Sequence, residues 1–185
     1  MPLTPIFDLD GTLVDSDAAL MAPFASLGVD PDRVPPLGLP LGQACELAGI
    51  TVDAYIEIYD VSASLAFAGV DELLSGLDRW AVCSNKTRTS GDAELARLGW
   101  TPELTMFSED FGGGPKRLEP VLEALGLGPE EVVFTGDTAH DRRCAAQAGV
   151  AFVLAGWNAR VEPEPGDIVL AHPKELLELL ERPRP

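Results

Sequence analysis

Short apolar segments alternate along this chain with apolar stripes at helical spacing, and few folds accommodate that order. The segments at 4–9, 80–83, 132–135 and 151–154 are short and bounded by polar or glycine positions, as buried parallel strands are. Weaker strand candidates lie at 104–107 and 168–170. Strands that alternate with helices predict an α/β fold, a doubly wound parallel sheet with helices on both faces.

Helical stripes separate most of these segments. They recur at i, i+3, i+4 and i+7 and consist of Val70, Leu73, Leu74 and Leu77, and of Leu118, Val121, Leu122 and Leu125. A last stripe, Leu176, Leu177 and Leu180, predicts a C-terminal helix, and we expect the tail at 182–185 to fray.

Residues 16–68 interrupt the alternation. They show three helical stripes and no convincing strand, with a proline-rich loop at 31–40 between the first two stripes. Pro23 must kink the first helix or make it start late. The third stripe runs from Ala54 to Leu65. We therefore predict a small all-helical cap at 16–68, inserted after the first strand of a catalytic core formed by 1–15 and 69–185.

The first segment ends in two carboxylates, Asp8 and Asp10, followed by Gly11 and Thr12. Alternate side chains of a strand point to the same side, so Asp8 and Asp10 could approach one site where the strand ends. One carboxylate could then attack phosphorus while the other moves protons. Gly11 allows a sharp turn there, and a turn alone is the competing interpretation.

Three further motifs follow later strands. Asp137 and Asp141, four residues apart, suit a hard cation with oxygen ligands, or an ordinary helix start. Ser84 and Asn85 could hold phosphate oxygens, although a capped turn is favoured for this segment alone. We expect Lys116 to open a helix, where a cation is electrostatically misplaced unless it neutralises an anion; a solvated lysine is the alternative.

These motifs lie at or just beyond strand ends, where α/β sheets bind ligands. Here the sequence resembles the haloacid dehalogenase (HAD) superfamily, specifically its phosphoglycolate-phosphatase-like branch with a helical cap. The first family motif, Asp-x-Asp-x-Thr, matches 8–12, and its extension through Asp15 and Ser16 is highly specific. The other three motifs match Ser84, Lys116 and the pair Asp137 and Asp141.

The resemblance implies a Mg²⁺-dependent phosphatase that acts on a small phosphorylated metabolite. Asp8 would be the nucleophile that forms an aspartyl-phosphate, and Asp10 would protonate the leaving oxygen and then activate water. Mg²⁺ would be held by Asp8, by the backbone carbonyl of Asp10 and by Asp137, with Asp141 acting directly or through water. The phosphoryl group would be bound by a set expected to comprise Gly11, Thr12, Ser84, Asn85 and Lys116.

Two alternatives stay open. A sugar phosphomutase of the same branch would need a cap that retains a bisphosphate, and a phospho-acceptor signalling domain would share the carboxylates, hydroxyl and lysine. Residues 16–68 carry seven acidic residues and a single base, Arg33, whereas a cap that binds a second anion should be more basic. This composition favours a phosphatase and argues against phosphoglycolate as the substrate.

The charge and the cysteine content of the chain bear on its partners and on its cellular compartment. The chain has 30 Asp and Glu against 13 Lys and Arg, a formal net charge of −17, so we expect neither nucleic acid nor a membrane surface as partner. Cys45, Cys83 and Cys144 show no metal or disulfide spacing, which suits the cytoplasm. We expect a monomer or homodimer. Tyr55 and Tyr59, one helical turn apart, could face a substrate pocket, but we favour packing roles for both.

Overall fold

The computed structural model describes residues 3–181 and contains a six-stranded parallel sheet. The tail at 182–185, expected to fray, lies outside the described residues. The strand order is β5-β4-β1-β6-β7-β8. The strands are β1 (Thr4–Phe7), β4 (Ala81–Cys83), β5 (Leu104–Met106), β6 (Val132–Gly136), β7 (Ala151–Ala155) and β8 (Ile168–Leu170). The predicted doubly wound α/β fold is confirmed, including both weaker strands.

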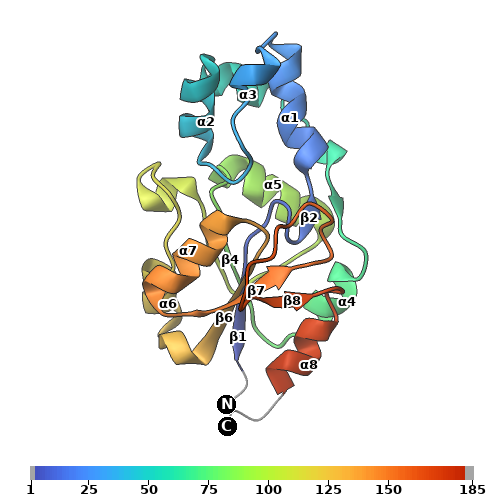
Figure 1. Cartoon of the computed structure of the whole chain (residues 1–185), viewed down its shortest axis with the longest axis vertical. Coiled ribbons are helices and arrows are strands. Elements are labelled where there is room, and N and C mark those ends of the chain that lie inside the picture. The colour runs from blue at the N-terminus through green and yellow to red at the C-terminus, as the bar shows by residue number, and fades with distance from the viewer. Residues whose placement is uncertain (1–2, 182–185) are drawn as a thin grey trace.

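Helices cover both faces of this sheet (Figure 1). They are α4 (Val70–Ser75), α5 (Arg88–Leu98), α6 (Glu119–Leu125), α7 (Ala139–Ala148) and α8 (Glu175–Glu181). Side chains alternate along each strand, so Phe7 and Val82 pack with α4, α5 and α8, whereas Ile6 and Phe134 pack with α6 and α7. Two separate apolar cores therefore flank one sheet.

Strand β1 lies at the centre, paired with β4 on one side and β6 on the other. Phe7 is level with Val82 and with Thr135 in these pairings. All three strands are parallel, so their carboxyl ends meet at one edge of the sheet. The chain leaving that edge carries Asp8 after β1, Ser84 after β4 and Asp137 after β6.

The helices α1 (Asp17–Ser26), α2 (Leu41–Ala48) and α3 (Val52–Ile58) stand above that edge, at the top of Figure 1. They enclose a small core of their own around Phe24, Cys45 and Tyr55. Helix α1 begins at Asp17 and contains Pro23, so the expectation of a late start is wrong. The loop at 31–40 holds one short 3-10 helix, η1 (Pro31–Arg33).

A two-stranded antiparallel ribbon connects the helical segment to the sheet domain. Val14 and Asp15 form β2 (Val14–Asp15), which pairs with β3 (Leu65–Ala66). The expectation of no strand within 16–68 is therefore wrong, and so is the third stripe, because α3 ends at Ile58. The chain turns extended at Tyr59 and continues through a short 3-10 helix, η2 (Val61–Ala63). Two-residue strands are too short to leave a periodic signal in sequence.

Among residues 3–181, no helix is long and apolar enough to cross a membrane.

Candidate active site

A tight turn directly after β1 sets the geometry of the site. The N–H groups of Leu13 and Val14 donate to the carbonyl of Leu9. Gly11 has φ +77°, and a Cβ there would lie 2.3 Å from Oδ2 of Asp137. Only glycine fits this position, because any side chain would be strained and would collide with Asp137.

Three buried carboxylates, those of Asp8, Asp137 and Asp141, converge above the sheet edge. Each offers an oxygen, and the three oxygens lie within 4.8 Å of one another. Lys116 Nζ lies 2.8 Å from Asp8 Oδ1 and 2.6 Å from Asp141 Oδ1. Asp141 also caps the start of α7, because its Oδ2 accepts hydrogen bonds from the backbone and hydroxyl of Thr138. The structure thus brings the first, third and fourth predicted motifs together.

The pKa values of these groups report their crowding. Burial raises the pKa of Asp8 to about 6, against the opposing attraction of Lys116. Burial and the charges of Asp141 and Asp8 raise the pKa of Asp137 to about 8. Burial also opposes ionisation of Asp141, yet Lys116 and the Thr138 hydrogen bonds keep its pKa below the usual range. Without a cation, these three carboxyl groups cannot all ionise. Such a cluster of oxygen donors fits a hard divalent cation.

Asp10 lies apart from this cluster and has a lysine of its own. Lys86 Nζ is 2.7 Å from Asp10 Oδ1 and 2.9 Å from Oε2 of Glu94, and it donates to the Tyr59 hydroxyl at 2.8 Å. Burial opposes the charge of Lys86, but these partners raise its pKa overall. The interpretation of Tyr59 as a packing residue alone is therefore wrong. Tyr55 does pack in the helical core, and its ring stacks on that of Tyr59.

Ser84 and Asn85, both buried, follow β4 into the site. The Ser84 hydroxyl accepts a 3.3 Å hydrogen bond from the Lys86 backbone. Asn85 bridges two loops, because its Nδ2 donates to Gly38 O at 2.8 Å and its Oδ1 accepts from Lys116 N at 2.7 Å. The expectation that Lys116 opens a helix is wrong, since α6 begins at Glu119 and Lys116 lies in the preceding loop.

The polar groups of Gly11 and Thr12 are engaged within the protein. The Gly11 N–H donates to Val14 O, and the Thr12 hydroxyl donates to Asp137 Oδ1 at 3.1 Å. Neither residue lines the cavity above the carboxylates. In this geometry Gly11 stabilises the turn and Thr12 holds the Asp137 side chain.

Arg160, in the loop after β7, is a site residue that the sequence analysis missed. Its Nη2 lies 2.9 Å from Asp137 Oδ2 and 2.9 Å from Asp17 Oδ1, so it joins the first turn of α1 to the carboxylate cluster. Nearby, Asn158 donates to Gly11 O at 2.8 Å. Lys86, Glu94 and Arg160 match none of the four motifs, so no local signal marked them.

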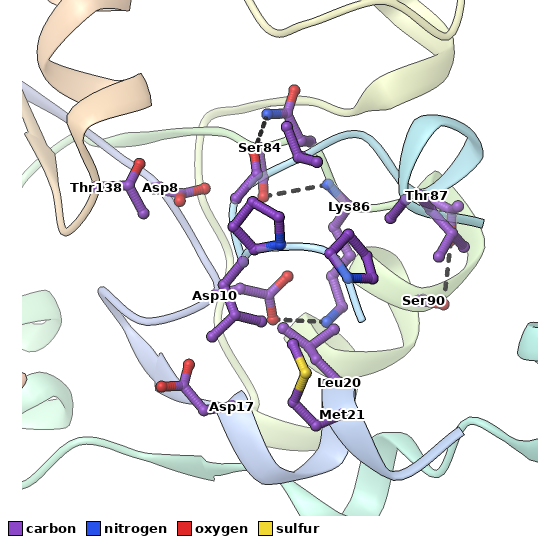
Figure 2. A pocket seen from close by; sticks show the side chains of 18 of the residues that line it. Asp8, Asp10, Asp17, Leu20, Met21, Ser84, Lys86, Thr87, Ser90 and Thr138 are labelled. Carbon is purple, nitrogen blue, oxygen red and sulfur yellow. Dashed lines mark hydrogen bonds and ion pairs between the residues drawn. The ribbon is translucent and has the colours of Figure 1, made fainter. Parts of the chain in front are cut away.

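A cavity that is partly open to solvent lies between the helical segment and the sheet edge. Asp8, Asp10, Ser84 and Lys86 line its floor. Figure 2 shows Lys86 reaching Asp10, with Leu20 and Met21 among the other side chains that line the cavity. Asp8 and Asp10 thus lie at one cavity together with Asp137 of the carboxylate cluster, an arrangement suited to nucleophilic and acid–base chemistry beside a cation.

Comparison with known proteins agrees with this arrangement. Residues 5–155 match the family described as haloacid dehalogenase-like hydrolase. A phosphoglycolate phosphatase of Xylella fastidiosa (strain 9a5c) is 27% identical over 86% of this chain and 82% of its own length. An N-acetylmuramic acid 6-phosphate phosphatase of Pseudomonas aeruginosa is 25% identical over 96% of this chain and 94% of its own length. A crystal structure of a HAD-superfamily hydrolase, subfamily IA, from Geobacter sulfurreducens superposes with a TM-score of 0.72 and 28% identity, covering 97% of this chain and all of the other.

Proposed function

The chain belongs to the haloacid dehalogenase-like hydrolase family, in its phosphoglycolate-phosphatase-like branch, and is a phosphatase; we propose that it hydrolyses a small phosphorylated metabolite through an aspartyl-phosphate on Asp8, with Mg²⁺ as cofactor. One observation carries the proposal. The buried Asp8 carboxylate faces the cavity, within ion-pair distance of Lys116 and beside the clustered carboxylates of Asp137 and Asp141.

The donor set supports Mg²⁺. Asp8, Asp137 and Asp141, together with the backbone carbonyl of Asp10, would hold the ion, and Mg²⁺ prefers oxygen ligands of this kind. When bound, Mg²⁺ neutralises negative charge on the phosphoryl group during transfer.

In the proposed reaction, a carboxylate oxygen of Asp8 attacks phosphorus, and the bond from phosphorus to the ester oxygen breaks. Asp10 donates its proton to that leaving oxygen, and the alcohol departs. Asp10 then takes a proton from a water molecule, whose oxygen attacks the same phosphorus. The bond to Asp8 breaks, inorganic phosphate is released and the Asp8 carboxylate is restored.

The surrounding residues would position these groups. The Ser84 hydroxyl and Lys116 ammonium would contact phosphoryl oxygens, and Asn85 would hold the Lys116 loop through its bond to Lys116 N. Lys86 would fix the Asp10 carboxylate in place. The assignment of Gly11 and Thr12 as phosphate contacts stays a prediction. The Gly11 N–H and the Thr12 hydroxyl donate hydrogen bonds within the protein, which does not support that role.

We propose that 16–68 acts as a cap over a core of 1–15 and 69–185, supported by the separate helical core and by the cavity beneath it. The three free, buried cysteines support a cytoplasmic location. A monomeric or homodimeric state stays a prediction.

Release of phosphate from 4-nitrophenyl phosphate in the presence of Mg²⁺ tests the proposal. We expect many turnovers per protein, loss of activity with excess chelator and recovery on adding Mg²⁺. A single equivalent of phosphate transferred per protein, with no further turnover, would instead indicate a phospho-acceptor domain. Undiminished turnover in excess chelator would contradict the metal assignment.

A further inference from the structure

We infer that this site takes phosphate monoesters whose leaving alcohol is uncharged and mainly apolar, and that a second anionic group on the substrate makes it a poor substrate. The inference rests on the proposed phosphatase function and names its substrate class. It depends on the cavity wall on the side that the helical segment lines.

That wall is built from apolar side chains of the helical segment. Helix α1 contributes Leu20, Met21 and Phe24, the loop before α2 contributes Leu37 and Leu39, and α3 contributes Tyr55. The Tyr55 hydroxyl is engaged, since it donates to Leu20 O at 2.8 Å. Leu20 and Met21 line the same cavity as Asp10, the residue proposed to protonate the leaving oxygen (Figure 2). The leaving group would therefore emerge from the floor against an apolar surface.

Each cation that lines the cavity already contacts two carboxylates. Among the described residues that line it, the cations are Lys86 and Arg160. Lys86 contacts Asp10 and Glu94, and Arg160 contacts Asp17 and Asp137. Arg33, the single base of residues 16–68, is exposed and does not line the cavity.

The charge balance of the cavity disfavours a second anion. Four carboxyl groups line it, those of Asp8, Asp10, Asp17 and Asp137, and both lining cations are already paired with carboxylates. Mg²⁺ and Lys116 would compensate the phosphoryl group itself. A carboxylate or second phosphate farther along the substrate would meet no free cation, and it could gain one only by separating an existing ion pair and leaving a buried charge unpaired.

The lack of a free cation in the cavity disfavours two specific alternatives, phosphoglycolate as the substrate and a sugar phosphomutase reaction. Phosphoglycolate carries a carboxylate, and a sugar phosphomutase must retain a bisphosphate intermediate. Both place a second anion against the apolar wall. Alkyl or aryl phosphates without further charge fit it, because their alcohol can be buried without desolvating an ion.

Two esters of matched shape test the inference, phenyl phosphate and 4-carboxyphenyl phosphate. We expect kcat/KM to be at least about tenfold higher for the neutral ester. The variant Met21→Lys places a cation in the apolar wall and should raise the relative kcat/KM for the carboxylated ester by about tenfold or more. Leu47→Lys adds the same charge at an exposed position of α2 outside the cavity, and should leave the ratio unchanged.

Binding of the non-hydrolysable analogues benzylphosphonate and 4-carboxybenzylphosphonate, measured by calorimetry with Mg²⁺, separates this inference from the proposed function. Turnover of both esters with equal or reversed preference would overturn the substrate class and leave the phosphatase function intact. Failure to turn over either ester would overturn the phosphatase function. In that case, tighter binding of the neutral phosphonate would still support the apolar subsite, and equal or weaker binding would overturn it.

Discussion

At the scale of single residues, Lys86 and Lys116 each lie between two carboxylates in the protein interior. Lys116 contacts Asp8 and Asp141, while Lys86 contacts Asp10 and Glu94. Both lysines are less than a tenth exposed. The carboxylate proposed as nucleophile and the one proposed for proton transfer therefore each have a separate lysine that holds them in place.

Asp8→Asn should abolish catalysis while preserving the fold. An amide cannot act as the attacking carboxylate, so we expect phosphate release to fall by at least about 10³-fold. Asp15→Asn is the matched control, since Asp15 belongs to the same motif but is exposed on β2. Circular dichroism checks the fold of both variants. Near-native kcat in Asp8→Asn would show that the nucleophile is another residue.

Lys86→Met should destabilise the protein strongly, because it leaves Glu94, fully buried, without its main cation. Loss of one partner of a buried ion pair costs about 3–5 kcal/mol. The double variant Lys86→Met/Glu94→Gln removes the stranded charge and should regain much of that loss. Urea unfolding of the parent, both single variants and the double variant measures the coupling. Strict additivity of the two single effects would argue against the ion pair.

At the scale of elements, the space around a helical glycine decides whether alanine can replace it without a clash. Gly91 in α5 is buried, and a Cβ there would lie 2.3 Å from the ring of Phe107. Gly42 in α2 has nothing within 4 Å of the same position. The two glycines lie in helices of this protein and differ in the space around them.

Alanine at these two positions should have opposite effects. Gly42→Ala should raise the free energy of unfolding by roughly 0.5–1 kcal/mol, because alanine loses less backbone entropy on folding. Gly91→Ala has the same entropic gain but overpacks Phe107, which costs about 1–3 kcal/mol, so the net effect should be destabilising. Chemical denaturation measures both. Stabilisation by Gly91→Ala would mean that α5 can move away from the sheet at little cost.

The strands of the sheet were predictable because each is a buried apolar run with a polar residue at its end. The turn at Gly11 and the positions of Asp8, Ser84 and Asp137 followed from the same pattern. The β2–β3 ribbon was not predictable, because two residues carry no periodicity. Lys86, Glu94 and Arg160 were missed for another reason. Lys86 and Arg160 contact Asp10 and Asp17, which lie 76 and 143 residues away in sequence, and Glu94 joins the site only through its contact with Lys86.

At the scale of the whole molecule, the carboxylate cluster links stability to pH. Asp8 and Asp137 have pKa values of about 6 and about 8, above the ordinary value of 3.8. At pH values between the ordinary pKa of an aspartate and these raised values, the folded protein binds more protons than the unfolded chain. The free energy of unfolding of the metal-free protein therefore falls as pH rises from about 4 to about 8.

We accordingly expect the metal-free protein to melt several degrees lower at about pH 8.5 than at about pH 5.5, since about 1 kcal/mol shifts Tm by about 2–4 °C at this size. Thermal melts in chelator measure this difference. Asp137→Asn removes the group with the highest pKa of the cluster and should reduce the fall. An unchanged or rising Tm in the parent between the two pH values would contradict the raised pKa values.

Mg²⁺ should raise Tm, and more so at the higher pH, because its ligands must lose their protons before they bind. A Mg²⁺ titration of the parent at both pH values measures the effect. Asp137→Asn should weaken the response more than Asp71→Asn, a change at an exposed carboxylate of α4. A Tm indifferent to Mg²⁺ at concentrations that support turnover would count against the site.

The β2–β3 ribbon has a consequence for how such a molecule can change over generations. Val14 faces Ala66 and Asp15 faces Leu65, so the chain leaves the sheet domain and returns to it at adjacent points. An exchange of everything between those points keeps strand order and register intact. The segment between those points could therefore be inherited, or recombined in the laboratory, as one part, provided that the contacts of Asp17, Gly38 and Tyr59 with Arg160, Asn85 and Lys86 are kept.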